Sequence, residues 1–193
     1  MMEFDFFAYL SRMRYIKRWS LMHSLVEENI MEHSDEVAVI AHALAVIGNT
    51  YFQKSYDIEK VLLYALYHES SEVITGDLPT PIKYFNKEIN TAYKDLEEKA
   101  CRKLLSTLPE EIRTEYEKSL LPDTDSKEYV LVKYADKLSA YIKCVLEVKS
   151  GNKEFSKAKQ SIGKALKEIE ADEVKYFMKN VIPVYEKTLD ELE

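Results

Sequence analysis

Glycine and proline are scarce in this chain of 193 residues, which contains four glycines and five prolines. Long stretches of periodically spaced apolar residues separate these few helix breakers, a pattern typical of an all-α protein with short loops. The sequence also lacks an apolar run near the roughly 20 residues that a membrane helix needs, and its N-terminus lacks the long apolar region of a signal peptide. We therefore expect a protein that does not enter a membrane.

Cysteine is also scarce, since Cys101 and Cys144 are the only two and their spacing matches no metal motif. Without a secretory context both are expected to be reduced thiols, which favours a cytoplasmic location. The chain has no block rich in lysine and arginine, and its formal net charge is −7. This argues against binding a nucleic-acid polymer, although a metal or one arginine can still reverse the field locally for a small anionic substrate.

Apolar and aromatic residues are plentiful, at 46% hydrophobic with 14 tyrosines and 7 phenylalanines, so the chain can bury a large core. Its length suits one domain, expected over residues 1–193. The apolar spacing and the capping residues predict helices over these ranges: Phe4 to about Tyr15, Met31 or Glu32 to Ile47, a central helix capped by Asp57, Lys87–Leu105, Pro109 to about Leu120, Lys127–Val148, Glu154–Ile169 and Glu173–Leu192. Gly48 is expected to end the second helix. Residues 16–29 are expected to be a loop or a short turn of helix, and residues 76–83 a loop.

The stretch ALYHESSEVITGDLPTPIKYF, residues 65–85, concentrates ionisable groups beside an apolar helix. The residues directly before His68 leave no polar face, so we expect a helix that is buried all round. His68, Glu69 and Glu72 then lie near its end, with Asp77 in the turn behind. Glu72 follows His68 by four residues, which places both on one face of that helix. Buried ionisable groups need partners or a metal, so this stretch is the first candidate for a functional site.

His33 and Asp136 extend the candidate site from two other predicted helices. The chain has four histidines; His33 opens one helix, and Asp136 lies beside the apolar stripe of another. Two imidazoles and one or two carboxylates from separate helices can close around a divalent metal in a bundle core. Nitrogen and oxygen ligands suit Mn, Fe, Co, Ni or Zn, and such a metal with one open position supplies a nucleophile near neutral pH.

The spacing alone leaves ordinary structural roles open for each of these residues. His33 also fits a helix cap or a surface position, and Asp136 also fits a salt bridge with Lys133 or Lys137. The two glutamates of the central stretch also fit exposed positions at a helix end. A metal site is therefore one hypothesis among several at this point.

The order of His33, then His68 followed by an acid, then Asp136 resembles the HD-domain metal phosphohydrolases. The segments FFAYLSRMRYIKRW, ENIMEHSDEVAVIAHALA, LYHESSEVITGDLPTPIKYFN, VKYADKLSAYIKC and GNKEF look like the bacterial YfbR-type 5'-deoxynucleotidases. The likeness covers nearly the whole chain, from Phe6 to about Leu192. It implies an HD-domain helical bundle, usually in a homodimer, that removes phosphate from deoxyribonucleoside 5'-monophosphates.

The resemblance implies four metal ligands, at His33, His68, Glu69 and Asp136. The name-giving pair of the family is His-Asp, whereas here His68 is followed by Glu69. Glutamate keeps the charge and is one methylene longer, so we expect activity to survive with the metal preference open to change. Two alternatives stay open. One is an HD-type phosphohydrolase acting on a cyclic nucleotide, a nucleoside di- or triphosphate or an alarmone; the other is a non-catalytic nucleotide-binding protein in which Glu69 marks a degenerate site.

The resemblance also implies how substrate is bound. Arg18 would bind the phosphate, because a guanidinium can take two phosphate oxygens at once. Trp19 would pack against the sugar and exclude a 2'-hydroxyl, although the residues alone fit a core anchor equally well. Asp77, Thr80 and Lys83 are expected to line the same pocket.

Glu72 and Asp77 are the residues to which the resemblance gives proton transfer or ordering of the attacking water. Which of them acts as acid and which as base stays open. From its place after Gly76, Asp77 also fits a plain turn residue.

Overall fold

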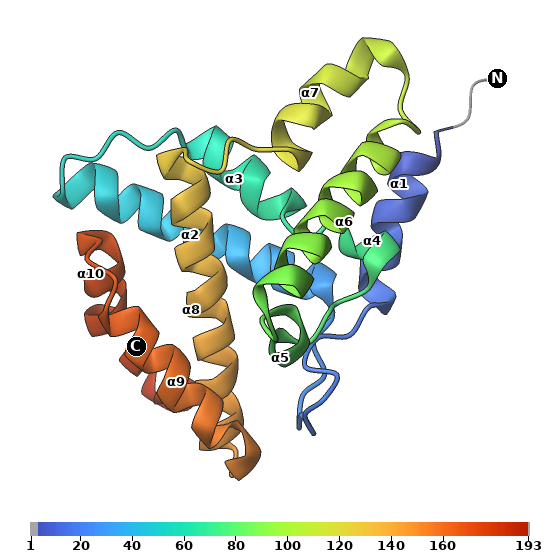
Figure 1. The fold of residues 1–193 in the computed structure, drawn as a ribbon. Helices are drawn as coiled ribbons and strands as arrows, with labels where there is room; N and C mark the ends of the chain where they lie inside the picture. Colours follow the sequence, from blue (N-terminus) through green and yellow to red (C-terminus); the bar gives the residue numbers. More distant parts are fainter. Residues whose placement is uncertain (1–3, 193) are drawn as a thin grey trace.

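The structure, a computed structural model, describes residues 4–192 and is α-helical (Figure 1). Its α-helices are α1 (Asp5–Leu10), α2 (Ile30–Tyr51), α3 (Ile58–Tyr67), α4 (Glu72–Thr75), α5 (Thr80–Lys83), α6 (Lys87–Leu105), α7 (Glu110–Leu120), α8 (Lys127–Lys149), α9 (Ser156–Lys167) and α10 (Asp172–Asn180). Short 3-10 helices are η1 (Ser11–Tyr15), η2 (Lys153–Phe155), η3 (Ile182–Glu186) and η4 (Leu189–Glu191). Within residues 4–192 the only β-type pairing is an isolated bridge between Lys17 and Asn29. The predicted all-α fold is therefore confirmed, and no helix in the described part of the chain is long and apolar enough to span a bilayer.

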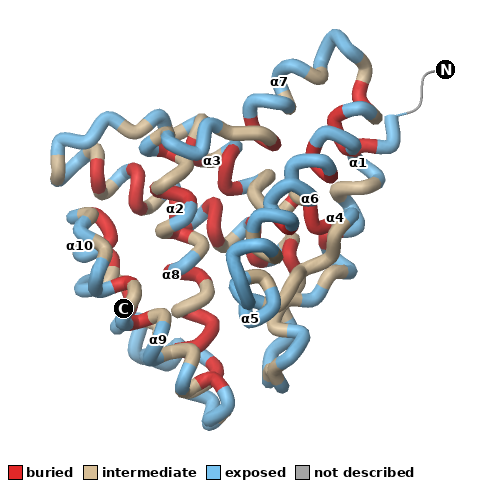
Figure 2. The backbone as a smooth tube through the Cα atoms, viewed as in Figure 1, coloured by how far each residue is buried: buried red, intermediate tan, exposed pale blue. Residues whose placement is uncertain are grey.

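The main core forms where α2 crosses α8, with α3 beside the crossing, α9 against α8 and α10 against α2 (Figure 1). Figure 2 shows the buried segments of these helices in red, while the middle of α7 is exposed. Ala41 and Leu44 of α2 and Leu138 of α8 are fully buried. Burying a large aliphatic side chain contributes about 1.5–3 kcal/mol, so this crossing is the stable frame of the molecule. A second apolar cluster joins α1, α6 and the end of α7 around Phe6 and Leu104.

Capping residues fix where several helices begin, as the sequence predicts. Asn29 starts α2 with a capping box, since its side chain accepts from the backbone of Glu32 and the Glu32 side chain accepts from the Asn29 backbone. Asp57, Asn86 and Ser126 cap α3, α6 and α8 in the same manner, each accepting a backbone N–H of the first turn. These starts follow from local hydrogen bonding and need no tertiary contact.

Three predicted boundaries are wrong. Helix α2 runs through Gly48 to Tyr51, and a Cβ on Gly48 would lie 2.8 Å from the ring of Tyr56. That glycine therefore allows a close approach instead of ending the helix. The predicted C-terminal helix 173–192 stops at Asn180 and gives way to η3, where Pro183 lacks a backbone donor. Residues 80–83, expected to be loop, form the single turn of α5.

The central helix also differs from the prediction. Helix α3 ends at Tyr67, His68 is its C-terminal cap, and Glu72 opens the separate helix α4. His68 and Glu72 therefore do not share a helical face. Helix α3 packs on α2, α8 and α7. Leu63 and Leu66 are nevertheless 37% and 44% exposed, so the helix is not buried all round. The turn after α3 still carries its ionisable residues to the point where α2 meets α8.

Candidate active site

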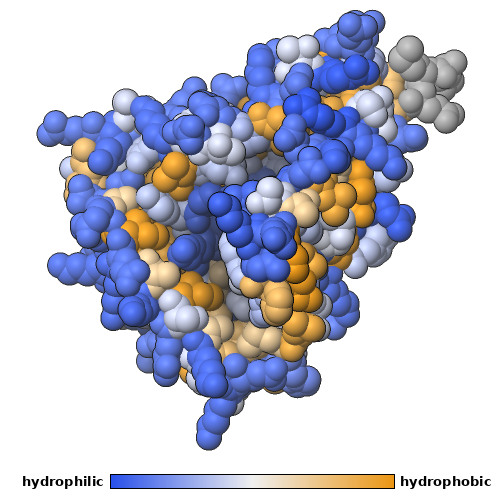
Figure 3. All heavy atoms as spheres, in the orientation of Figure 1, coloured by the Kyte–Doolittle hydropathy of each residue, from blue (hydrophilic) through white to orange (hydrophobic). Residues whose placement is uncertain are grey.

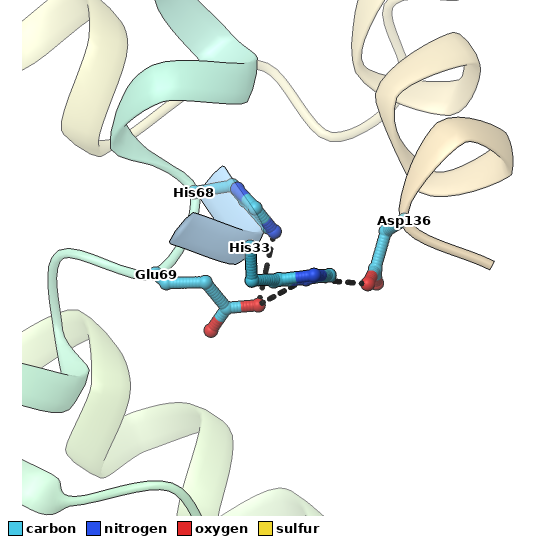
Figure 4. A group of neighbouring side chains, drawn as sticks. All are labelled: His33, His68, Glu69 and Asp136. Carbon is cyan, nitrogen blue, oxygen red and sulfur yellow. Dashed lines mark hydrogen bonds and ion pairs between the residues drawn. The ribbon is translucent and has the colours of Figure 1, made fainter. Parts of the chain in front are cut away.

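Four side chains from three parts of the fold meet beside the α2–α8 crossing (Figure 4). His33 comes from the first turn of α2, His68 and Glu69 from the turn after α3, and Asp136 from the middle of α8. One ligand atom from each lies within 4.8 Å of the others. His33 Nε2 is 3.1 Å from Asp136 Oδ1 and 3.8 Å from Glu69 Oε1, which is itself 3.0 Å from His68 Nε2. This group of four, called here the metal cluster, can hold a metal ion.

His68 is arranged as metal-binding histidines are. Its Nδ1–H donates to the backbone carbonyl of Ala65 over 2.7 Å, which leaves the lone pair on Nε2. Nε2 is buried and has no hydrogen-bond partner of good geometry within residues 4–192. A buried imidazole nitrogen without a partner is costly, and a metal ion at the cluster supplies the missing contact. The donor set therefore fits a divalent transition metal.

His33 is fully buried and is not a helix cap, because Asn29 has that role. Its Nδ1 lies 3.1 Å from the hydroxyl of Ser139, and that hydroxyl donates to Glu36 over 2.5 Å. This network orients the imidazole so that Nε2 faces Asp136. Ordering of the outer nitrogen by a hydroxyl and a carboxylate is typical of metal-binding histidines.

The charges of the cluster are strongly coupled. Burial by itself raises the pKa of Glu69 and of Asp136, but the adjacent imidazoles outweigh it, His68 for Glu69 and His33 for Asp136. Both pKa values therefore lie well below their usual range. Burial lowers the pKa of His33, but its hydrogen bond to Asp136 outweighs this and raises it. The carboxylates stabilise positive charge at the point where a cation would bind. Asp136 also forms the ion pair with Lys133 that its spacing allowed, at 3.7 Å.

Arg18 reaches the same site from a loop. Residues 16–29, called here the arginine loop, fold back at their base, where Arg18 N donates to Glu28 O and Ile30 N donates to Ile16 O. Arg18 Nη1 lies 2.5 Å from Glu28 Oε1 and 2.8 Å from His33 Nδ1. Burial alone lowers the pKa of Arg18, but Glu28, Asp136 and the other carboxylates outweigh it and raise that pKa. The guanidinium is therefore charged beside the metal cluster.

Trp19 is held in the same loop by a polar and an aromatic contact. Its indole N–H donates to Glu28 Oε2 over 3.1 Å, and its ring centroid lies 5.3 Å from that of Phe155. Its backbone has φ of 59°, in the left-handed region. Trp19 is thus a half-buried loop residue beside Arg18, and not an anchor at the end of the first helix.

Glu72 and Asp77 lie on the side of Glu69, on α4 and in the turn after it. Glu72 is 5% exposed and its Oε2 has no partner within residues 4–192. Burial raises the pKa of Glu72, and the neighbouring Glu69 carboxylate raises it further. Burial likewise raises the pKa of Asp77, opposed by the charge of Arg18. Both carboxyl groups therefore lie within electrostatic reach of the site.

Thr80 and Lys83 stand on α5, which borders the site together with α8. Figure 3 shows this face hollowed between α8 and the α5–α6 pair, with hydrophilic residues in the hollow. The Lys83 ammonium pairs with Glu97 at 2.7 Å and lies 4.7 Å above the ring of Tyr93. Thr80 is exposed, and its side chain forms no hydrogen bond within residues 4–192. Neither residue joins the metal cluster, but the charge of Lys83 acts on the carboxyl groups of Glu72 and Asp77.

Glu28, Glu36 and Ser139 support the site and were missed from sequence. Glu36 follows His33 by three residues on α2, and Ser139 follows Asp136 by three on α8. Residues three apart share a helical face, so a search for polar residues one turn beyond each predicted ligand finds both. Glu28 has no such signal, because only the folding back of the arginine loop places it beside Arg18.

Solved structures define the fold class. An HD-domain phosphohydrolase from Listeria innocua matches with a TM-score of 0.82 at 24% identity, covering 94% of this chain and 88% of the other. The HD phosphohydrolase DatZ of cyanophage S-2L, solved with dA and one catalytic Zn2+ ion, matches with a TM-score of 0.61 at 18% identity, covering 91% and 95%. The chain therefore has the fold of the HD-domain phosphohydrolases.

Sequence comparison then gives the family. The model of the YfbR-like 5'-deoxynucleotidases matches residues 5–185. A 5'-deoxynucleotidase of Vibrio cholerae is 49% identical over 193 residues, which is the full length of both chains. One of Pectobacterium atrosepticum is 46% identical over 194 residues, covering 100% of this chain and 97% of the relative. The chain belongs to the YfbR-like 5'-deoxynucleotidase family, as the sequence motifs predict.

Proposed function

We propose that this protein is a metal-dependent 5'-deoxynucleotidase, which hydrolyses deoxyribonucleoside 5'-monophosphates to a deoxynucleoside and phosphate. The observation that carries this proposal is the meeting of two imidazoles and two carboxylates within 4.8 Å, with a half-buried arginine 2.8 Å from one of the imidazoles. The names of the full-length relatives and the nucleoside bound to DatZ support the same substrate class.

His33, His68, Glu69 and Asp136 would hold the metal, which when bound supplies Lewis acidity and an activated water. Arg18 binds the phosphate. Of its nitrogens, only Nη1 is engaged by other side chains within residues 4–192, so the remaining donors of the fork are available to phosphate oxygens. Stabilising charge on those oxygens is the main task in phosphoryl transfer.

The carboxyl groups of buried Glu72 and half-buried Asp77 hold and move protons in this proposal. The unpartnered Oε2 of Glu72 lies in a dry environment, which suits a group that exchanges a proton during the reaction. Asp77 follows Gly76, whose φ of 72° turns the chain back toward the site. Thr80 and Lys83 line the substrate pocket, and Trp19 packs against the sugar at the position of a 2'-hydroxyl.

The metal is a divalent transition metal. Imidazole and carboxylate ligands suit Co, Mn, Zn, Fe or Ni, and the Zn2+ ion in DatZ supports zinc among these. The homodimer that the family resemblance implies is a further prediction, and light scattering at several protein concentrations tests it.

Phosphate release from dAMP and from AMP tests the proposed function. Protein stripped with a chelator is reloaded separately with Mn, Co, Zn or Mg, and inorganic phosphate is measured. We expect release from dAMP well above that from AMP, restored by a transition metal. Asp35→Ala is the matched control, because Asp35 is an exposed carboxylate on α2 outside the site.

The same assay separates the alternatives by product. A phosphodiesterase leaves a monophosphate instead of inorganic phosphate, and an enzyme acting on di- or triphosphates or alarmones is silent with dAMP. Silence with every metal and each of these substrates contradicts an enzymatic function. In that case Glu69→Asp is made, and its continued silence favours a non-catalytic nucleotide-binding protein.

A further inference from the structure

The tip of the arginine loop receives little support from apolar packing. Leu21, Leu25 and Val26 are 64%, 52% and 70% exposed. Beneath the loop lies a cavity of about 290 Å³, lined among others by Leu25, Val26, Glu28 and His33. Because these apolar side chains face water and a cavity lies beneath them, burial of apolar surface does not fix the position of the loop tip. Its position must come from polar contacts.

Those contacts converge on one buried carboxylate at the end of α8. Glu147 is 3% exposed and accepts hydrogen bonds from the backbone N–H groups of Leu25 and Val26, at 3.0–3.2 Å. The Lys143 ammonium donates to Glu147 over 2.6 Å and also to the carbonyl of Val26. The Glu147 carboxylate and the Lys143 ammonium thus both bind backbone groups of the loop.

Asn152 completes the arrangement from the segment after α8. Its side-chain amide donates to Glu147 over 2.8 Å and to the carbonyl of His23 over 2.8 Å. The next residues form η2, where Phe155 is fully buried beneath the Trp19 ring and lies 5.8 Å from the Lys143 ammonium. One short segment of chain therefore holds both the tip of the loop and its tryptophan.

We propose that Glu147, with Lys143 and Asn152, is a positioning residue that fixes the arginine loop and thereby sets the affinity for the phosphate and the selectivity for the sugar. This polar group, called here the loop clamp, touches neither the metal cluster nor Arg18. It acts through the loop backbone, because Arg18 and Trp19 lie between η1 and the clamped tip, and Glu28 lies between that tip and α2. The kinetic part of this proposal rests on the proposed function, while the structural part does not.

The chain provides a direct readout, because Trp19 is its only tryptophan. Quenching of its fluorescence by acrylamide reports how well the arginine loop is held, independently of any activity. We expect Glu147→Gln to raise the quenching constant at least twofold and to raise KM for dAMP between about ten- and a hundredfold, with a smaller change in kcat, because misplacement of a binding group has effects of that size. The preference for dAMP over AMP narrows in the same variant.

Two further variants keep the test decisive. Glu170→Gln is the matched control, since Glu170 forms an exposed ion pair with Lys175, and it should leave quenching and kinetics unchanged. Asn152→Ala removes contacts of the loop clamp without leaving a buried charge, so it decides the matter if Glu147→Gln does not fold. Glu147→Asp keeps the charge, so its quenching constant and its KM for dAMP should lie between those of Glu147→Gln and those of the wild-type protein.

Unchanged quenching in folded Glu147→Gln and Asn152→Ala overturns the loop clamp. Raised quenching with KM and the dAMP preference unaltered overturns its role in substrate binding. If the wild-type protein releases no phosphate, the proposed function fails, and the quenching comparison still decides whether Glu147 positions the loop.

Discussion

His33, His68 and Asp136 stand on α2, at the end of α3 and on α8, whose facing sides form the main core. Arg18 and Trp19 stand on the arginine loop, whose tip is exposed and tied down by the loop clamp. The first region gains its geometry from apolar burial, which depends little on pH and is not screened by salt. The second depends on charged hydrogen bonds, which are sensitive to both.

This difference has a functional meaning under the proposed reaction. The metal ligands must keep their mutual distances through every turnover, so they are placed on the most stable part of the fold. A phosphate-binding arginine must take up and release a ligand, and a loop held by a few polar contacts can do so at low energetic cost. Substitutions in the two regions should therefore damage different properties.

The largest effect is expected from Asp136→Ala. Removing this ligand should abolish metal binding and lower activity more than about a hundredfold, because the metal supplies the nucleophile. Helical content and Trp19 quenching should stay unchanged, since Asp136 is half-buried at the surface of the frame and does not touch the arginine loop. Metal analysis and circular dichroism check this, with Asp35→Ala as control. Full metal stoichiometry in Asp136→Ala contradicts its role as a ligand.

Trp19→Ala should alter selectivity and leave the metal cluster intact. Without the indole the space at the sugar opens, and the ratio of kcat/KM for dAMP over AMP should fall by about tenfold or more. Tyr15→Ala is the control, because Tyr15 is an aromatic residue just before the loop that is 71% exposed. An unaltered ratio shows that Trp19 does not contact the sugar.

Glu69→Asp should produce a smaller effect, confined to the metal cluster. The side chain shortens by one methylene, which withdraws the carboxylate by about 1.5 Å from a site built around Glu69 Oε1 at 3.0 Å from His68 Nε2. We expect about tenfold weaker metal affinity and a different order of metal preference. Metal titration of Glu69→Asp beside the exposed control Glu59→Asp measures this; unchanged affinity means that the site adapts to either length.

Acid should loosen the arginine loop before it unfolds the helices. Burial raises the pKa of Glu147, but hydrogen bonds from Lys143, Leu25 and Asn152 outweigh it and hold the pKa at about 2, below the ordinary 4.5. The contribution of Glu147 is therefore complete above pH 4.5 and is lost as the pH falls toward 2. In chelated protein, Trp19 quenching should rise over this range while the helical signal persists, and the rise should be smaller in Glu147→Gln. If Trp19 quenching and the helical signal change over the same pH range, the two regions do not differ in their sensitivity to acid.

Local chemistry made much of the fold predictable. The caps at Asp57, Asn86 and Ser126 mark helix starts because each satisfies backbone N–H groups of its own first turn. The continuation of α2 past Gly48 was not predictable, since it depends on Tyr56 packing against that glycine. The end of α3 at Tyr67 was missed for a different reason: its apolar residues fit a longer buried helix equally well.

The candidate site was predictable only in part. The family motifs singled out the four residues of the metal cluster, and the structure brings them together, while their roles as ligands stay predictions. The loop clamp had no sequence signal, because Glu147 meets Leu25 and Val26 across more than half the chain. Such contacts follow from the packing of α8 beside the arginine loop, and spacing along the sequence does not encode them.

The left-handed backbone of Trp19 has a consequence for how this protein can change. At φ of 59° any residue with a Cβ is destabilised by about 1–2 kcal/mol, and only glycine removes that strain fully. A screen for thermal stability alone would therefore favour small, flexible residues at position 19, against the aromatic ring that contacts Phe155 and Glu28. Under the proposed role of Trp19 at the sugar, a variant selected for heat resistance without AMP as a counter-substrate should also discriminate less between dAMP and AMP.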